Sequence, residues 1–151
     1  AVVQAFDADL VVSATQLREA ARLAARAVAR DAAVARDPGV EIMLYAAGRR
    51  QIDRALELGV SEGERAAVVL LTDFGEVREA DRSAADLDGG VEAVRRLAVD
   101  STETSGGDPG TGFDEDRVRE FYGVTDRELA ATNGDLADVV RERVALLDVE
   151  K

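Results

Sequence analysis

The sequence predicts an α+β fold in which a single small mixed sheet is covered by helices, giving two layers. Three features lead to this prediction. Residues 66–72 form a continuous apolar run of a length typical of a buried strand, whereas residues 16–36 and 136–147 carry apolar side chains at helical spacing. A length of 151 residues suits one domain with its own core, so we treat residues 1–151 as a single domain.

The first part of the chain contains a strand and a long helix. Residues 1–6 read as a short strand, and because the chain begins inside it, we expect part of an N-terminal strand to be missing. Ser13 or Thr15 can cap a helix over residues 16–36, which ends before a Pro-Gly pair. The apolar line of this helix consists of Leu17, Ala21, Ala24 and Val28.

The middle of the chain begins with an apolar stretch whose periodicity does not separate strand from helix. We predict a helix over residues 40–47 because Met, Leu and Ala favour it, and a second short helix over residues 50–58 after a turn at Gly48. Residues 66–72 are then the central strand. Beyond it we expect a surface loop at 73–90, a short helix at 91–98 and a mobile loop at 100–112, whose spacing differs from that of a phosphate-binding loop.

The last part of the chain predicts three helices. Acidic residues 114–116 begin the first, and Thr125 with Glu128 forms a capping box for the second. The final helix has apolar residues on one side, at Leu136, Val140, Val144 and Leu147, with further apolar residues beside them. This surface is broader than one core-facing stripe, so the helix is either buried on two sides or meets a partner. Val140, Val144 and Leu147 are our candidate partner-binding residues.

Composition excludes several classes of function. There is no cysteine and no histidine, so the usual nucleophiles, general bases and metal ligands are missing, and we predict a protein that is not an enzyme and holds no cofactor or metal. No apolar run approaches the ~18 residues of a membrane span, which indicates a cytoplasmic protein. The net charge of -12, with one lysine in the chain, favours a salt-adapted, halophilic source over GC bias alone.

Four arginines lie four residues apart along the helix predicted over residues 16–36. They are Arg18, Arg22, Arg26 and Arg30, and this spacing places them on one side of the helix. Two interpretations stay open: a solvated helix face, or a track for an RNA backbone. On the second interpretation Arg22 and Arg26 are candidate RNA-binding residues.

Three segments carry a resemblance to a known family. Residues 41–60 follow Glu-Ile-x-Leu-Tyr-x-x-Gly-x-Arg-Gln-Ile-x-x-Ala-Leu-x-x-Gly-Val, and residues 121–129 read Phe-Tyr-Gly-Val-Thr-Asp-Arg-Glu-Leu. With residues 142–149, they resemble the PRPK-binding protein (TPRKB) family of KEOPS (EKC) accessory subunits, its archaeal branch in particular. The second segment departs from the family's Phe-Gly-Ile-Thr-x-x-Glu-Leu by the inserted Tyr122 and by Val124 in place of isoleucine.

The resemblance implies a non-catalytic subunit of a complex that makes threonylcarbamoyladenosine in tRNA. Such a subunit docks on the kinase-like subunit and, in archaeal members, captures the single-stranded CCA end of the tRNA. Carried over onto this sequence, the candidate RNA-binding residues are Gly48, Arg50, Gln51 and Ile52, with Arg49 at a variable position. Arginine and glutamine side chains reach phosphates and base edges.

Alternatives stay open at this stage. Ile52 and Tyr45 can pack on a splayed base or belong to the core, and Arg50 can pair with Glu41. A second class of function is a structural adaptor that stabilises the kinase-like subunit without touching RNA. The sequence predicts neither the oligomeric state nor the order of the strands.

Overall fold

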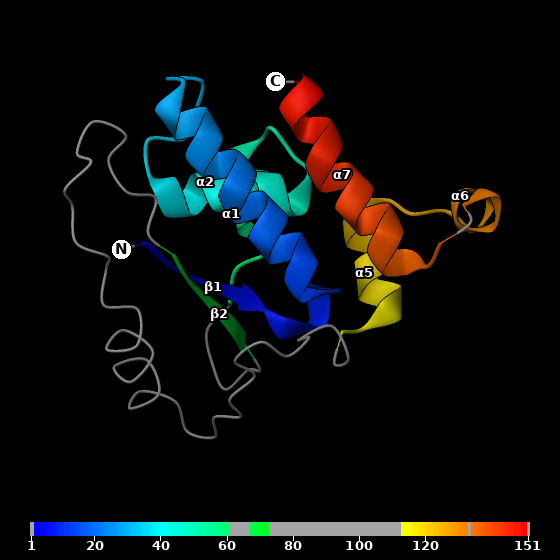
Figure 1. Ribbon diagram of the computed structural model, residues 1–151. Coiled ribbons are helices and arrows are strands. Elements are labelled where there is room, and N and C mark those ends of the chain that lie inside the picture. The colour runs from blue at the N-terminus through cyan, green and yellow to red at the C-terminus, as the bar shows by residue number, and fades with distance from the viewer. Residues whose placement is uncertain (1, 61–66, 73–112, 133, 151) are drawn as a thin grey trace.

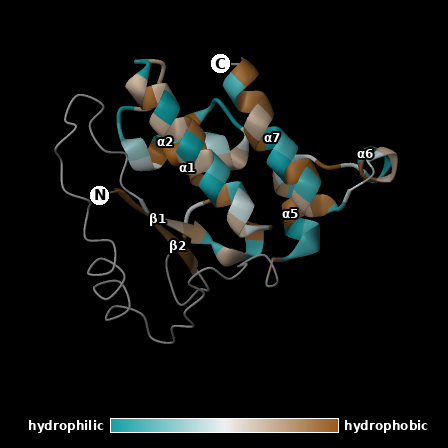
Figure 2. Cartoon of the chain, in the orientation of Figure 1, coloured by the Kyte–Doolittle hydropathy of each residue, from teal (hydrophilic) through white to brown (hydrophobic). Residues whose placement is uncertain are grey.

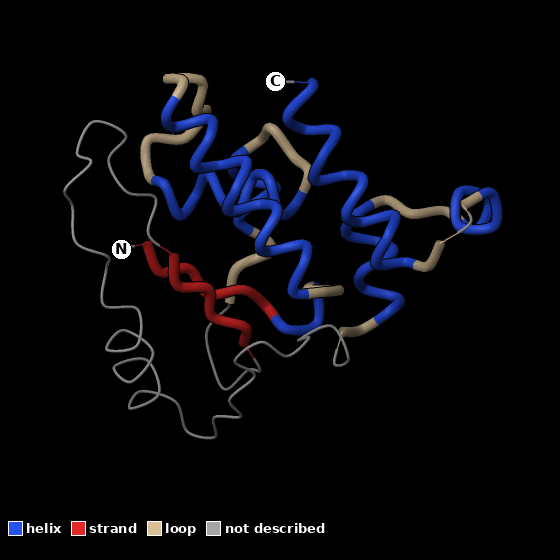
Figure 3. Tube along the Cα trace, viewed as in Figure 1, coloured by secondary structure: helices blue, strands red, loops and turns tan. Residues whose placement is uncertain are grey.

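The computed structural model describes residues 2–60, 67–72, 113–132 and 134–150. Helices dominate this part of the chain, and one pair of strands lies along one side of it (Figures 1 and 3). The α+β prediction is confirmed. The predictions for residues 73–90, 91–98 and 100–112 lie outside the described residues. The elements in order are β1 (Val2–Asp7), α1 (Ala14–Ala29), α2 (Pro38–Ala47), α3 (Ile52–Leu56), β2 (Ala67–Thr72), α5 (Glu115–Tyr122), α6 (Asp126–Ala131) and α7 (Leu136–Glu150), with a 3-10 turn at Ala8–Leu10.

The two strands pair antiparallel, with Val2 opposite Thr72 and Phe6 opposite Val68. Side chains alternate between the faces of a sheet, so Val2, Phe6 and Val68 share one face, and all three pack into or against the core. On the other edge of β1, Phe6 forms an antiparallel bridge with Gly59, which follows the turn after α3. The sheet thereby fixes where α3 lies.

Helix α2 is the central helix of the molecule. It packs against α1, α3, α7 and β1, and every residue from Glu41 to Ala47 is buried. Burial on all sides explains why its sequence is apolar except for Glu41, and the prediction of a helix for residues 40–47 is confirmed. The helices around it alternate between hydrophobic and hydrophilic residues, as expected of helices with one face inside (Figure 2). None of the helices described is long and apolar enough to cross a membrane.

Helix α1 is shorter than predicted. Ser13 caps it by accepting the amide of Gln16, as expected, but the helix ends at Ala29, and Asp31 has a φ of 56°. The residues after it are held by Glu41 of α2, whose buried carboxylate accepts the amides of Val34 and Ala35. The apolar line was also misplaced at one position: Val28 is 42% exposed.

Buried polar groups join α5 to the rest of the core. The Gln16 side chain accepts the amide of Val12 and donates to the Ala46 carbonyl and the Tyr122 hydroxyl. That hydroxyl in turn donates to the Leu10 carbonyl at 2.7 Å. Burial raises the pKa of Tyr122, so the hydroxyl keeps its proton and remains a donor. This network fixes the C-terminal end of α5 beside the C-terminal end of α2.

Candidate nucleic-acid and partner interface

The candidate loop begins where α2 ends at Gly48. This glycine has a φ of 64°, in the left-handed region, and donates to the Tyr45 carbonyl, while the Arg49 amide reaches back to Leu44 at 3.0 Å. This pair of hydrogen bonds is the Schellman arrangement, which turns the chain sharply and satisfies the last carbonyls of the helix. The backbone of Gly48 and Arg49 is therefore fixed by α2 itself.

Helix α7 lies directly under this turn. A Cβ built at Gly48 would stand 3.0 Å from the Arg143 Cβ and 3.0 Å from the Arg143 carbonyl oxygen. Distances this short are tight, so α7 or the turn would have to shift by a few tenths of an ångström to accommodate a Cβ at this position. Glycine is therefore needed at position 48 both for its conformation and for the close approach of α7.

The side chain of Arg49 is half-buried and makes a bond within the protein. Its Nη2 donates to the Phe121 carbonyl at 2.6 Å, at the C-terminal end of α5. Unpaired carbonyls at a helix C-terminus carry partial negative charge, so a guanidinium is a favourable partner there. This bond connects the loop to α5, and the predicted RNA contact of Arg49 would have to use its other donors.

The next three residues lie at the surface. Arg50 and Gln51 are both exposed, and Gln51 caps α3 without using its side chain. Ile52 is 39% exposed, and Leu56 and Val60, later in the sequence, are also exposed apolar residues. Two donors thus stand beside an apolar surface, a combination able to bind a phosphate or base edge and cover a base.

Tyr45 does not belong to this surface. It is fully buried and donates its hydroxyl to Asp148 of α7 at 3.2 Å. Of the two interpretations of Tyr45, the core is therefore the right one. Glu41 is likewise buried in the first turn of α2.

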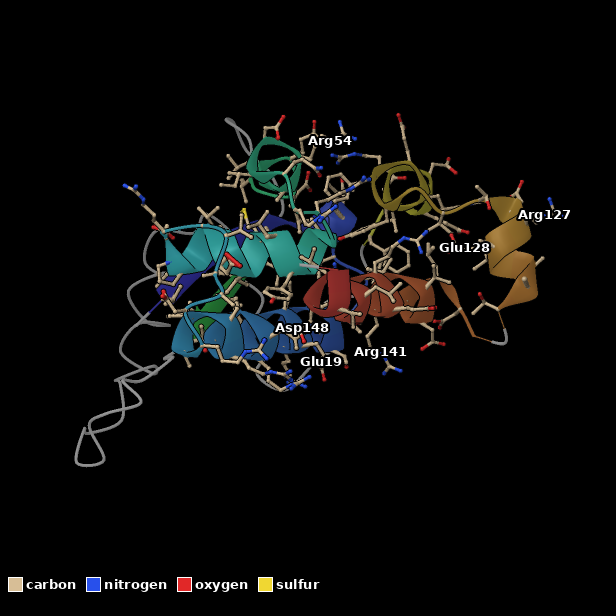
Figure 4. All side chains as sticks on the ribbon, turned by 90° about the horizontal axis from the view of Figure 1, so that it is seen from above. Glu19, Arg54, Arg127, Glu128, Arg141 and Asp148 are labelled. Carbon is tan, nitrogen blue, oxygen red and sulfur yellow. The ribbon has the colours of Figure 1, made fainter. Side chains whose placement is uncertain are left out.

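The arginines of α1 lie elsewhere. Arg22 pairs with Glu19 at 2.7 Å, and Arg26 and Arg30 approach Asp148 at 3.4 and 3.5 Å. Figure 4 shows Glu19 and Asp148 on the opposite side of α2 and α7 from Arg54 of α3. Arg22 and Arg26 therefore do not share a site with the loop of residues 48–52, and their side of the molecule has mixed charge.

The structure also adds residues that the sequence did not single out. Arg143 of α7 donates to the carbonyls of Tyr122 and Gly123, each at 3.2 Å, and to both carboxylate oxygens of Glu128 at 2.7 and 2.6 Å. As predicted, the Thr125 side chain caps α6 by accepting a hydrogen bond from the Glu128 amide. The Glu128 side chain bonds Arg143. The only signal for this contact was that its residues fall within two of the three segments that carry the resemblance, 121–129 and 142–149.

Comparison with known proteins gives the family. A family model described as "Kinase binding protein CGI-121" matches residues 2–148. The chain belongs to this family. No curated protein matches the sequence.

The name of the CGI-121 family indicates a kinase partner. The structure corrects the predicted partner-binding residues. Val140, Val144 and Leu147 were the candidate partner contacts, but they are 0 to 1% exposed and form the core under α7. They are closed to a partner because α1 and α2 already cover that face. The exposed large apolar residues of α7 are instead Leu146 and Val149, at 42% and 80%.

Within the described residues of this CGI-121 chain, no group of three or more histidine, cysteine, aspartate or glutamate side chains converges in a way that would hold a metal ion. Arg49 and Arg143 bond backbone carbonyls at the end of α5, and Arg143 also bonds Glu128. The arrangement suits binding through hydrogen bonds and apolar contact.

Proposed function

We propose that the chain is a non-catalytic subunit of the KEOPS tRNA-modification complex, which makes threonylcarbamoyladenosine. In this proposal it binds the kinase-like subunit and also the single-stranded CCA end of the tRNA. The family match supports the first contact. The observation that carries the second is the exposed Arg50-Gln51-Ile52 segment, which follows a backbone turn held by α2, α5 and α7.

The chemistry of an RNA terminus suits this segment. An unpaired nucleotide offers a phosphate, base edges and a flat face, and proteins bind such ends by donors and by apolar or aromatic packing. Arg50 and Gln51 supply the donors, and Ile52 supplies the apolar surface next to them. A turn that is already ordered loses little entropy when the ligand arrives, so a few contacts are enough.

The charge of the protein limits the kind of RNA contact. A net charge of -12 repels a polyanion, and high salt weakens phosphate contacts further because less is gained from counterion release. A small site for one single-stranded end tolerates both conditions better than a broad basic surface does. Arg22 and Arg26 stay predictions for a separate contact with the tRNA body, and their ion pairs with Glu19 and Asp148 weaken that case.

A second candidate function is an adaptor that binds only the kinase-like subunit. The observation that favours it is the pair of exposed apolar residues near the end of α7, Leu146 and Val149. In our proposal this pair is the kinase contact and the loop after α2 is the RNA contact. The two functions then occupy different residues and can be removed one at a time.

Replacing Arg50 and Gln51 together by alanine tests the RNA contact. We expect tRNA affinity, measured by fluorescence anisotropy, to fall about tenfold or more, since hydrogen bonds to charged groups contribute about 1.5–3 kcal/mol. Arg54→Ala is the matched control, because it removes one exposed cation from the adjacent helix and tests charge alone. Both variants should melt close to wild type because their side chains are exposed. Equal affinities for the double variant and the control would favour the adaptor.

A further inference from the structure

Three segments that lie far apart in the sequence meet at one residue, Arg143. The first contributes Gly48, and the second contributes the carbonyls of Tyr122 and Gly123 together with Glu128. The third contains Arg143 itself. These are the segments 41–60, 121–129 and 142–149 that were recognised in the sequence. Their common feature in space is that they hold the turn after α2 in place.

Arg143 acts on two sides. Its Cβ and backbone carbonyl form the surface against which Gly48 packs, as the 3.0 Å distances show. Its guanidinium extends the other way and bonds two carbonyls at the end of α5 and both oxygens of Glu128. Residue 143 therefore contacts both the turn after α2 and the C-terminal end of α5.

Arg49 completes the connection. It crosses from the turn to the Phe121 carbonyl, so two guanidiniums bond three consecutive carbonyls at the end of α5. Helix α5 is in turn fixed to the core by the Tyr122 hydroxyl, which bonds Gln16 and Leu10. A rigid base of this kind leaves the backbone at Arg50 and Gln51 little freedom.

We propose that Arg143 is a positioning residue for the RNA-binding turn. It does not touch RNA; it joins α7 to the C-terminal end of α5 beside the turn that α2 forms, so that Arg50 and Gln51, which follow this turn, are presented in one orientation. Its effect on RNA affinity rests on the proposed function, whereas its effect on the order of the turn does not. Arg49 belongs to the same connection through its bond to the Phe121 carbonyl.

The test is Arg143→Lys. Lysine keeps the charge and the Cβ that packs on Gly48, but its single ammonium group does not reproduce the planar guanidinium bonded to two carbonyls and a carboxylate. Arg141→Lys is the matched control, since Arg141 is an exposed arginine on the same helix. The measurements are backbone ¹⁵N order parameters of residues 49–51 and affinity for tRNA with and without its CCA end.

We expect the order parameters of Arg50 and Gln51 to fall in Arg143→Lys from about 0.85 toward about 0.6, and to stay unchanged in Arg141→Lys. Affinity for intact tRNA should fall about three- to tenfold, because the turn must be ordered on binding. Affinity for tRNA without its CCA end should not change. A general loss of stability would lower order throughout the chain instead of at the turn.

Unchanged order parameters in Arg143→Lys would overturn the positioning role. Lower order with unchanged affinity for intact tRNA would support that role and reject the RNA contact, so the two failures are distinguishable. If Arg143→Lys does not fold, Glu128→Gln decides, because Glu128 is half-exposed and its loss removes the carboxylate half of the connection. A smaller, local fall in order is expected there, and no fall would overturn the proposal.

Discussion

Replacing Gly48 by alanine tests how closely the turn and α7 approach each other. A non-glycine residue in the left-handed conformation costs about 1–2 kcal/mol, and Gly48 has a φ of 64°. In addition the new Cβ would lie 3.0 Å from the Arg143 Cβ and carbonyl oxygen. Overpacking of this kind typically costs about 1–3 kcal/mol, so we expect a total loss of about 2–5 kcal/mol.

Gly123→Ala is a control that separates the two costs. Gly123 also ends a helix, α5, and has a φ of 67°, but no atom lies within 4 Å of a Cβ built there. The same substitution therefore causes the backbone strain without the collision, and we expect a loss of about 1–2 kcal/mol. The difference between the two variants measures the contact between the turn and α7.

Urea denaturation followed by circular dichroism gives both free energies of unfolding. We expect Gly48→Ala to be less stable than Gly123→Ala by about 1–3 kcal/mol, which corresponds to a melting temperature lower by about 2–12 °C. Equal losses in the two variants would refute the reasoning, since they would show that α7 yields without cost at this position.

Two further predictions concern α7 and its surroundings. Val149→Glu places a charge on the proposed kinase contact. We expect it to weaken capture of the kinase-like subunit about tenfold without lowering the melting temperature. Unchanged capture would show that this end of α7 is not part of the interface. The bond to Arg143 lowers the pKa of Glu128 in the folded state. The ion pair therefore contributes its full stability above the unfolded-state pKa of about 4.3. This contribution is lost as the pH falls through the lower folded-state pKa. The difference in stability between wild type and Glu128→Gln should therefore be largest near neutral pH and vanish in acid, and a constant difference across this range would show that the ion pair is not its cause.

Local signals in the sequence were enough for most of the helices. The caps at Ser13 and Thr125 lie where the sequence places them, because a side-chain oxygen and a nearby amide are sufficient to form a cap. The end of α1 was missed, because it depends on Glu41 bonding the amides that follow the helix. That contact is part of the tertiary structure, so the sequence of residues 29–36 alone does not predict where the helix ends.

In the candidate site too, the sequence predicted local features but not contacts between distant residues. The sequence located the turn at Gly48 and the exposed Arg50 and Gln51, since glycine and polar residues mark a surface turn. The sequence did not predict that Arg49, unlike the exposed Arg50, bonds the Phe121 carbonyl, because this carbonyl lies 72 residues away. An apolar line on a helix is equally compatible with a core and an interface, which is why Val140, Val144 and Leu147 were assigned to a partner.

The central claim is that the turn after α2 binds the unpaired end of a tRNA. The most direct measurement compares the affinity of the wild-type protein for intact tRNA and for the same tRNA without its CCA end, with the Arg50→Ala/Gln51→Ala variant beside it. We predict that wild type binds intact tRNA at least about tenfold more tightly, and that the variant does not distinguish the two RNAs. Equal wild-type affinities for both RNAs would contradict the claim.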